Sequence, residues 1–188
     1  MTTDLRPRLK MTYEDLLYLP EDGKRHEIID GEHYVTPAPA PLHQRLVSRL
    51  DRTLGVWIDE QRLGELFVAP LDVRFSEFDV VQPDLVFLSR DRLNRLGEKS
   101  LGGPPDLVIE VLSDSTRRAD EVTKRHLYER YGVGEYWIVD PLLESAKVYR
   151  LGNDGRYVRV AEPSVENGGA FESPLFPGFS LPVARLFD

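Results

Sequence analysis

The sequence contains no cysteine, and this absence excludes two kinds of site. Neither a disulfide framework nor a thiolate-bound metal can form without cysteine. The four histidines, which do not have the spacing of a zinc-binding motif, are His26, His33, His43 and His126. A zinc site is therefore less favoured than a site for a harder ion that prefers oxygen ligands.

Long apolar runs and an excess of positive charge are also missing. No stretch approaches the roughly 18 apolar residues of a membrane span, and residues 1–10 have three basic side chains but no apolar segment of a signal peptide. We therefore expect a cytoplasmic protein with no membrane partner. The net charge of −8 argues against broad adhesion to nucleic acid, although it leaves room for a local basic groove.

Two catalytic motifs are absent as well. The pair Gly102-Gly103 precedes two prolines and a predicted strand, so it does not match a glycine-rich loop that binds phosphate at the start of a helix. No Gly-x-Ser-x-Gly segment occurs, so the nucleophile elbow of a serine hydrolase is missing. The pattern therefore favours neither a nucleotide-binding protein nor a serine hydrolase.

The order of strand-like and helix-like segments predicts one domain of the α/β (α+β) class. We expect a flexible tail over residues 1–10 and a single domain over residues 11–188. One helix is predicted from Leu42 to about Arg62, and another follows the central strand and ends near Tyr131. Tight hairpin turns are predicted at Asp30-Gly31 and Asn153-Asp154-Gly155. The expected architecture is a mixed central β-sheet flanked by helices, with β-hairpins at its periphery.

The first of these helices carries an apolar stripe at helical spacing. Its predicted members are Leu42, Leu46, Val47, Leu50, Leu54, Trp57 and Ile58. His43 lies in the first turn, where the pattern alone favours a surface or capping residue. Glu27 lies in the first strand of a hairpin, and by the same reasoning it is interpreted as a solvated strand residue.

The stretch Leu107–Leu112 organises the rest of the chain. It is a short, β-branched apolar run interrupted only by Glu110, which is typical of a strand buried on both faces. The carboxylate needs a partner, because even a neutral polar group buried alone costs roughly 2–7 kcal/mol. Asp84 opens a second apolar strand directly after Pro83. It either converges on Glu110 or only accepts a hydrogen bond from a turn amide.

Lys124 is the best candidate partner for Glu110. At 100° per residue, an arc of about 80° on the second helix contains Asp120, Lys124, Leu127, Tyr128 and Tyr131. Because the apolar and aromatic members of this arc must be buried, Lys124 is predicted to point toward the sheet. The alternative is that its stem passes the aromatic rings and its ammonium group reaches solvent.

Two acids and a lysine that meet at low dielectric indicate a site for hydrolysing a phosphodiester. Converging carboxylates repel, and one stays protonated unless a cation lies between them. A hard divalent ion with oxygen ligands, Mg²⁺ or Mn²⁺, removes this conflict. A lysine in the same cleft would orient or deprotonate a water molecule and neutralise charge that develops on a phosphate.

Several stretches of the chain match a known family in the same order. They are Glu27-Ile28-Ile29-Asp30-Gly31-Glu32, His43-Gln44, Gln82-Pro83-Asp84, Pro105 to Ser113, Asp120 with Lys124, Gly132-Val133 with Glu135-Tyr136-Trp137, and Leu175-Phe176-Pro177-Gly178. Together they span about residues 12–186. The chain resembles the Uma-type putative restriction endonuclease family, a domain of unknown function within the PD-(D/E)XK nuclease superfamily.

The resemblance implies a restriction-endonuclease-like fold and gives roles to single residues. Asp84 would be the metal-binding aspartate of the PD half of the motif. Glu110 would be the second acid and metal ligand, with the backbone of Val111 beside it. The superfamily's lysine should follow that acid by two residues, where this chain has Leu112, and the resemblance moves its role to Lys124 on the following helix.

Other matching positions are implied to support this site. Glu27 corresponds to a further catalytic acid. The positions expected to form hydrogen bonds around the metal ligands are His43, Asp106 and Asp120. Asp106 also rivals Asp84 as the PD aspartate, because it follows Pro105 and shares a strand face with Glu110. We prefer Asp84, since the superfamily takes its two acids from two different strands.

The resemblance implies a Mg²⁺- or Mn²⁺-dependent endonuclease that hydrolyses DNA phosphodiester bonds. A homodimer would suit two-strand cutting, and the segment Tyr136-Trp137 is predicted to form its exposed hydrophobic edge. The alternative is a catalytically inactive nuclease-fold module that binds nucleic acid or protein. Leu112 and the acidic composition favour this alternative, whereas the inward-facing Lys124 and the two intact acids favour the enzyme.

Overall fold

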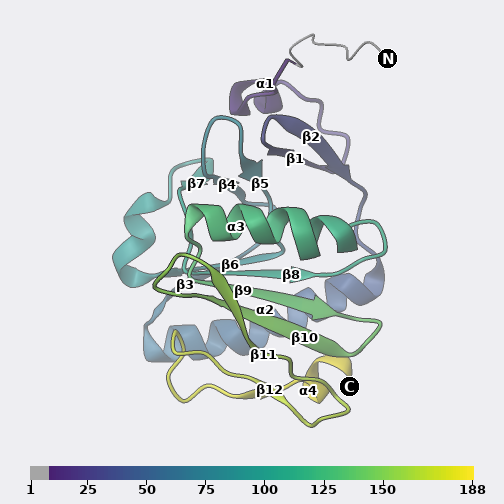
Figure 1. Ribbon diagram of the computed structural model, residues 1–188, viewed down its shortest axis with the longest axis vertical. Coiled ribbons are helices and arrows are strands. Elements are labelled where there is room, and N and C mark those ends of the chain that lie inside the picture. The colour runs from purple at the N-terminus through teal and green to yellow at the C-terminus, as the bar shows by residue number, and fades with distance from the viewer. Residues whose placement is uncertain (1–8) are drawn as a thin grey trace.

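Residues 9–188 are described by the computed structural model (Figure 1). Residues 1–8, most of the predicted tail over residues 1–10, lie outside the described residues. The strands are β1 (Arg25–Ile29), β2 (Glu32–Thr36), β3 (Gly64–Val68), β4 (Asp72–Arg74), β5 (Val80–Val81), β6 (Leu85–Ser89), β7 (Ser100–Gly102), β8 (Leu107–Val111), β9 (Glu135–Asp140), β10 (Ser145–Leu151), β11 (Tyr157–Ala161), β12 (Ala170–Phe171) and β13 (Leu181–Pro182). The helices are α1 (Tyr13–Leu17), α2 (Pro41–Gln61), the 3-10 helix η1 (Arg90–Arg95), the π-helix η2 (Ala119–Lys124), α3 (Arg125–Tyr131) and α4 (Ala184–Phe187).

Helices cover both faces of the larger of two mixed sheets. That sheet has six strands in the order β11-β10-β9-β8-β6-β3, and the smaller has five in the order β2-β1-β5-β4-β7. Helix α2 packs on one face of the larger sheet, and α3 lies on the other face, between the two sheets (Figure 1). Each sheet contains parallel and antiparallel pairs, so the predicted mixed α/β architecture is confirmed.

Alternation along β8 directs Glu110 toward α3. The apolar odd-numbered residues of this strand pack in the core beneath α2, and its apolar even-numbered neighbours pack in the core beneath α3. Glu110 shares the parity of the second set and is 2% exposed. The predicted strand buried on both faces is therefore confirmed, with its single carboxylate beneath the helix that carries Lys124.

Helix α2 begins one residue before its predicted start and buries most of the predicted stripe. Its fully buried members are Leu46, Leu50, Leu54 and Ile58. The prediction that Leu42 is buried is wrong, since 46% of this residue is exposed, whereas His43, expected at the surface, is only 9% exposed. The first turn of α2 lines a polar cavity, so its inward position holds the histidine instead of the leucine.

The second predicted helix begins with a π-helical turn. Residues 114–116 form turns, and the hydrogen bond from Ser113 N to Thr116 Oγ1, at 3.2 Å, closes this segment. The helix then runs through η2 and α3 and ends as predicted at Gly132, which adopts φ 77°. Single π-helical turns are rare and occur frequently at functional sites.

One prediction about the surface is wrong. Tyr136 and Trp137, expected as an exposed edge, are fully buried because β9 is an interior strand. Trp137 stacks on Phe171, with ring centroids 5.1 Å apart. The homodimer stays a prediction, but Tyr136 and Trp137 cannot form its interface because they are buried.

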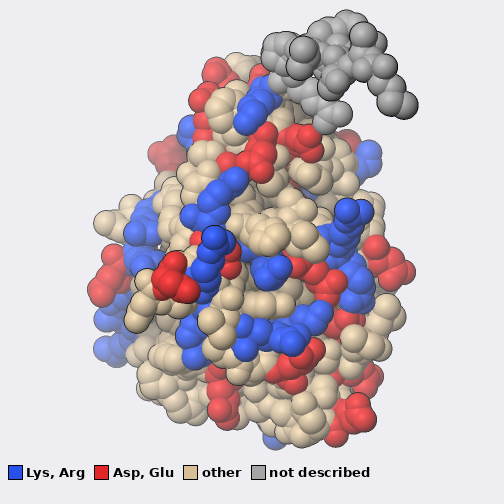
Figure 2. All heavy atoms as spheres, in the orientation of Figure 1, with Lys and Arg blue, Asp and Glu red and all other residues tan. Residues whose placement is uncertain are grey.

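The surface around α3 mixes charges of both signs. Figure 2 shows basic and acidic side chains interspersed over the face that carries α3 and the β10–β11 hairpin. Ion pairs on these elements include Lys147–Glu121 at 2.6 Å, Arg150–Glu135 at 2.8 Å and Arg156–Glu129 at 3.0 Å. Within residues 9–188, no helix is both long and apolar enough to cross a membrane.

Candidate active site

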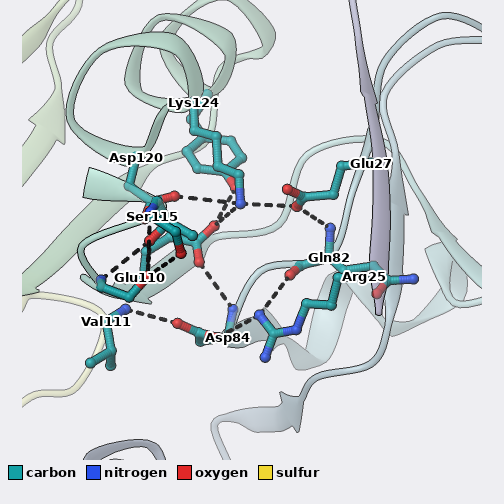
Figure 3. Close-up of polar contacts among 12 residues, drawn as sticks. Arg25, Glu27, Gln82, Asp84, Glu110, Val111, Ser115, Asp120 and Lys124 are labelled. Atoms are coloured by element: carbon teal, nitrogen blue, oxygen red, sulfur yellow. Dashed lines mark hydrogen bonds and ion pairs between the residues drawn. The ribbon is translucent and has the colours of Figure 1, made fainter. Parts of the chain in front are cut away.

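A cavity of about 290 Å³ lies where the carboxyl end of β8 meets the start of α2 and the β1–β2 hairpin. Residues 36–40 and 113–116 form part of its wall. The charged and imidazole side chains that line it are Arg25, Glu27, His43, Asp84, Glu110, Asp114, Asp120 and Lys124. Figure 3 shows most of them converging on one centre, from β1, β8, η2 and the segment just before β6.

Asp84 ties three parts of the fold together just before β6. Its Oδ2 accepts hydrogen bonds from Val111 N and His43 Nε2, each at 2.9 Å, and its Oδ1 accepts one from Arg25 Nη1 at 2.6 Å. Burial raises the pKa of Asp84, but the hydrogen bond and charge of His43 and the charge of Arg25 outweigh it, so the pKa lies below its usual value. This aspartate therefore stays ionised at neutral pH.

Glu110 accepts hydrogen bonds on both carboxylate oxygens. Its Oε1 accepts from Lys124 Nζ at 3.0 Å and from Tyr128 Oη at 2.9 Å, and its Oε2 accepts from Asp84 N at 3.3 Å. Burial raises the pKa of Glu110 to about 8, although Lys124 opposes the rise, and neighbouring carboxylates add to it. The sequence predicted that converging carboxylates would keep one of them protonated. Glu110 is that carboxyl group, since its raised pKa lets it hold its proton near neutral pH.

Lys124 lies inside the protein and binds three carboxylates. Its Nζ is 2.9 Å from Glu27 Oε1, 3.0 Å from Glu110 Oε1 and 3.5 Å from Asp120 Oδ1, and the residue is 5% exposed. Burial lowers the pKa of Lys124, but the three carboxylates outweigh it and raise the pKa well above its ordinary value. The predicted pairing of Lys124 with Glu110 is confirmed, and the alternative of a solvated ammonium group is wrong.

The π-helix η2 presents Asp120 and Lys124 to the same cavity. The two residues are four apart, and both are buried. Tyr136 Oη donates a hydrogen bond to Asp120 O at 3.1 Å, which anchors the π-helical turn to β9. Asp120 Oδ1 accepts no hydrogen bond from residues 9–188, although Lys124 Nζ lies 3.5 Å away, so this buried oxygen can still take a further donor or cation.

Glu27 is buried, and its interpretation as a solvated strand residue is wrong. It is 3% exposed, and its Oε1 accepts a hydrogen bond from Gln82 N at 2.8 Å in addition to its contact with Lys124. Strand β1 carries it across the cavity from η2 (Figure 3). The smaller sheet thus contributes the Glu27 carboxylate to the cavity, in addition to Asp84 and Glu110.

The cluster has more negative than positive charge. When all are ionised, the carboxylates of Glu27, Asp84, Glu110 and Asp120 face two permanent cations, Arg25 and Lys124. Two negative charges are therefore in excess, and the proton held by Glu110 removes only one of them. Buried unbalanced charge is costly, so the cluster favours an additional cation.

The oxygen atoms around Asp84 and Glu110 fit a hard divalent ion. Both side chains line the cavity, and the backbone of Val111 lies against Asp84. No group of three or more His, Asp or Glu side chains in the described part of the chain forms a ready-made metal cage. Mg²⁺ does not require one, because it keeps several waters and uses one or two carboxylates plus substrate phosphates. The ligands from the protein would be Asp84, Glu110 and the Val111 carbonyl.

Asp106 lies outside the cluster, so its predicted supporting role is wrong. Its Oδ2 accepts a hydrogen bond from Ser89 N at 2.8 Å, and its Oδ1 is 3.2 Å from Arg92 Nη1. It shares a strand face with Glu110 but lies four residues earlier, about 13 Å along an extended chain. Asp106 therefore caps the opposite end of the sheet, and it does not rival Asp84 within the cavity.

Two residues of the cluster were not predicted as site residues. Arg25 was overlooked, although it lies two residues before Glu27 in β1 and therefore on the same strand face. Tyr128 was predicted only as a buried aromatic, yet its hydroxyl binds Glu110. Tyr128 is four residues after Lys124 and therefore on the same helix face, and this spacing could have identified it as a site residue.

The Tyr128→Phe substitution is expected to lower the free energy of unfolding by about 1–3 kcal/mol, because it removes a hydrogen bond to a buried oxygen of Glu110. Chemical denaturation at pH 7 measures this change. Tyr149→Phe is the matched control, since the Tyr149 hydroxyl makes no hydrogen bond to residues 9–188 and its ring contacts are kept. Equal losses in the two variants would contradict a specific contribution from the Tyr128 hydroxyl.

Comparisons with known proteins identify the family and a similar fold. The family model Uma2, described as "Putative restriction endonuclease", matches residues 13–184. The fold is similar to a crystal structure of a putative nuclease belonging to DUF820 from Anabaena variabilis ATCC 29413, with a TM-score of 0.78, 21% sequence identity, and coverage of 94% of this chain and 97% of that chain. A comparison with curated proteins gives no match. Because the family model covers nearly the whole chain, the protein belongs to the Uma2 family of putative restriction endonucleases.

Proposed function

We propose that the protein is a metal-dependent endonuclease that hydrolyses DNA phosphodiester bonds. The observation that carries the proposal is the convergence of Asp84, Glu110 and Lys124 in one cavity with an excess of negative charge. Nucleases of the PD-(D/E)XK type need two acids and a lysine in this relation, and family membership supports a nuclease. The excess charge supports a divalent cation.

Asp84, Glu110 and the Val111 carbonyl would hold Mg²⁺ or Mn²⁺. When bound, such an ion polarises a phosphoryl oxygen and lowers the pKa of a coordinated water. Lys124 remains protonated because its three carboxylate neighbours raise its pKa. It therefore acts as a fixed positive charge that stabilises negative charge developing on the phosphate, and the structure gives no support for its use as a base.

Glu27 and Asp120 are positioning residues in this proposal. Glu27 Oε1 and Asp120 Oδ1 contact the Lys124 ammonium from opposite sides of the cavity, which fixes where its charge lies (Figure 3). His43 does the same for Asp84 through Oδ2. A preorganised charge costs no rearrangement when the reaction begins.

The alternative is a nuclease-fold module that binds nucleic acid or protein without cutting, and Leu112 is the observation that favours it. Leu112 occupies the usual lysine position and is buried in the apolar core beneath α3. Lys124 weakens this alternative, since its Nζ reaches the Glu110 carboxylate from the neighbouring helix. In this proposal Lys124, twelve positions after Leu112 in sequence, takes the role of the missing lysine.

Nicking of supercoiled plasmid tests the proposal. The parent protein is expected to nick in Mg²⁺ or Mn²⁺ and to stop in excess chelator, whereas Asp84→Asn is expected to show no nicking because it removes a negatively charged ligand. Asp106→Asn is the matched control, since it changes a carboxylate that lies outside the cluster. Equal nicking by Asp84→Asn would show a contaminant or another site. Absence of nicking in every protein, with DNA still bound, would favour the binding module.

A further inference from the structure

The permanent cation that pairs with Asp84 is one arginine from the smaller sheet. Arg25 lies in β1, and its Nη1 is 2.6 Å from Asp84 Oδ1 and 3.4 Å from Gln82 O. Its side chain is 23% exposed, whereas that of Asp84 is 2% exposed. No other guanidinium nitrogen of Arg25 makes a hydrogen bond to the described residues. The buried Asp84 carboxylate is therefore paired with a partly exposed guanidinium group that contacts it through one nitrogen, Nη1.

Arg25 occupies the oxygen atom that a metal ion needs. Asp84 Oδ2 already accepts hydrogen bonds from Val111 N and His43 Nε2. Oδ1 has Arg25 as its partner, so an ion that binds Asp84 directly competes with the guanidinium group. This competition weakens the apparent affinity for the metal ion, because only the fraction of molecules in which Oδ1 is free can bind it.

Arg25 also lies where two cavities meet. The first is the cavity of the acid cluster, and the second, of about 340 Å³, runs beside α2 and β3. The side chains that line both are Arg25, Pro39 and His43. A guanidinium released from Asp84 would therefore face a groove continuous with the acid cluster, where a phosphate next to the reacting one would lie.

We propose that Arg25 is an exchangeable counter-ion, which pairs with Asp84 in the metal-free protein and, when a divalent ion displaces it, binds a phosphate of the nucleic-acid strand in the second cavity. The exchange adds one positive charge at Asp84, because a divalent ion replaces the single charge of Arg25, and the released guanidinium pairs with a phosphate. Arginine suits both partners, since its planar fork binds carboxylate and phosphate alike. The inference rests on the proposed metal-dependent nuclease activity.

Calorimetric titration with Mn²⁺ tests the first half of the exchange. Arg25→Gln removes the competitor and is expected to bind Mn²⁺ about tenfold more tightly than the parent, while Arg25→Lys, which keeps the charge, stays closer to the parent. Lys99→Gln is the control for net charge, because Lys99 is exposed and lines neither of the two cavities. Thermal melting of each protein establishes that it is folded before titration.

The outcomes separate the inference from the proposed function. Tighter binding in Arg25→Gln alone supports the exchange. Equal or weaker binding in Arg25→Gln, with the parent still binding Mn²⁺, overturns the exchange and leaves the proposed function standing. Tighter binding in Lys99→Gln as well shows a general charge effect and overturns the exchange. Absence of Mn²⁺ binding in the parent overturns both.

DNA binding measured with Ca²⁺ in place of the catalytic ion, and with chelator, tests the second half. Arg25→Gln is expected to lower the slope of log affinity against log salt by about one in Ca²⁺, because one phosphate contact is lost. In chelator the slope should be unchanged, since Arg25 is then held by Asp84. An equal change in both buffers, or no change in Ca²⁺, overturns phosphate binding by the released arginine.

Discussion

The Lys124→Met protein is expected to nick DNA about 10²–10³-fold more slowly than the parent and to lose about 3–5 kcal/mol of unfolding free energy in metal-free buffer. Both effects come from the same contacts. The ammonium group of Lys124 is 2.9 Å from Glu27 and 3.0 Å from Glu110, and the side chains involved are nearly inaccessible to solvent. Methionine fills the space of the stem but leaves these carboxylates without a cation.

Metal binding separates a catalytic from a purely structural role of Lys124. Removal of a positive charge makes the cluster more negative, so Lys124→Met is expected to retain Mn²⁺ binding in calorimetry while nicking is lost. Loss of nicking and metal binding to the same degree would show that Lys124 only holds the fold together. Chemical denaturation with and without Mn²⁺ supplies the stability measurement, because a ligand that binds the folded state stabilises it.

Lys147→Met is the matched control for this substitution. Lys147 also pairs with a glutamate, Glu121, at 2.6 Å, but about a quarter of each side chain is exposed. A surface pair of this kind contributes about 0–1 kcal/mol. A loss in the control as large as that in Lys124→Met would contradict the claim that burial makes the Lys124 contacts strong.

The periodicity of the sequence was sufficient to predict the central pairing of the site. A six-residue apolar run with one acid identified β8 and Glu110, and an arc of aromatic residues on the next helix turned Lys124 toward that strand. These two elements are joined by one short connection, so local patterns determine their contact. Burial of Glu110 follows directly, because its neighbours on both strand faces belong to apolar cores.

Contacts between distant segments were beyond the reach of such patterns. The alternation of side chains along the strand puts Asp106 on the same face as Glu110. It does not show that Asp106 lies at the opposite end of the strand, beside Ser89. Glu27 and Arg25 reach the cavity because the small sheet folds over α3, a tertiary contact that no local spacing encodes. His43 was predicted at the surface because a lone polar residue in a first helical turn has no local reason to be buried.

Helical geometry set a further limit on prediction. A regular α-helix was expected from the cap-rich segment after β8, but the chain forms turns there and then the π-helix η2. The hydrogen bond from Tyr136 Oη to Asp120 O supports this turn from β9. Because Tyr136 was expected at an exposed edge, its contribution to the site was not foreseen.

The Glu110→Gln protein is expected to be as stable as the parent near pH 5 and more stable near pH 8 in metal-free buffer. Burial raises the pKa of Glu110 to about 8, from an ordinary value of 4.5. Between these two values the folded state binds more protons than the unfolded state, so the free energy of unfolding falls as pH rises. Each unit of separation corresponds to about 1.4 kcal/mol, so the parent loses several kcal/mol across this window.

Glutamine has no proton to lose, so its variant lacks this component of the pH dependence. The raised pKa of Asp120 acts in the same direction in both proteins. The lowered pKa of Asp84 contributes stability that is lost only as the pH falls below its ordinary value of 3.8, outside the window. Denaturant titrations of parent, Glu110→Gln and the exposed control Glu98→Gln at pH 5 and pH 8 measure the difference.

Saturating Mn²⁺ gives the sharpest form of this test. An ion bound between Asp84 and Glu110 favours the ionised carboxylate, so it should restore much of the parent's stability at pH 8 and do so less in Glu110→Gln, which has lost a charged ligand. Parallel loss of stability in parent and variant from pH 5 to pH 8 would mean that Glu110 is ionised throughout and that its pair with Lys124 outweighs burial. The metal-free cluster would then carry its full excess of two negative charges.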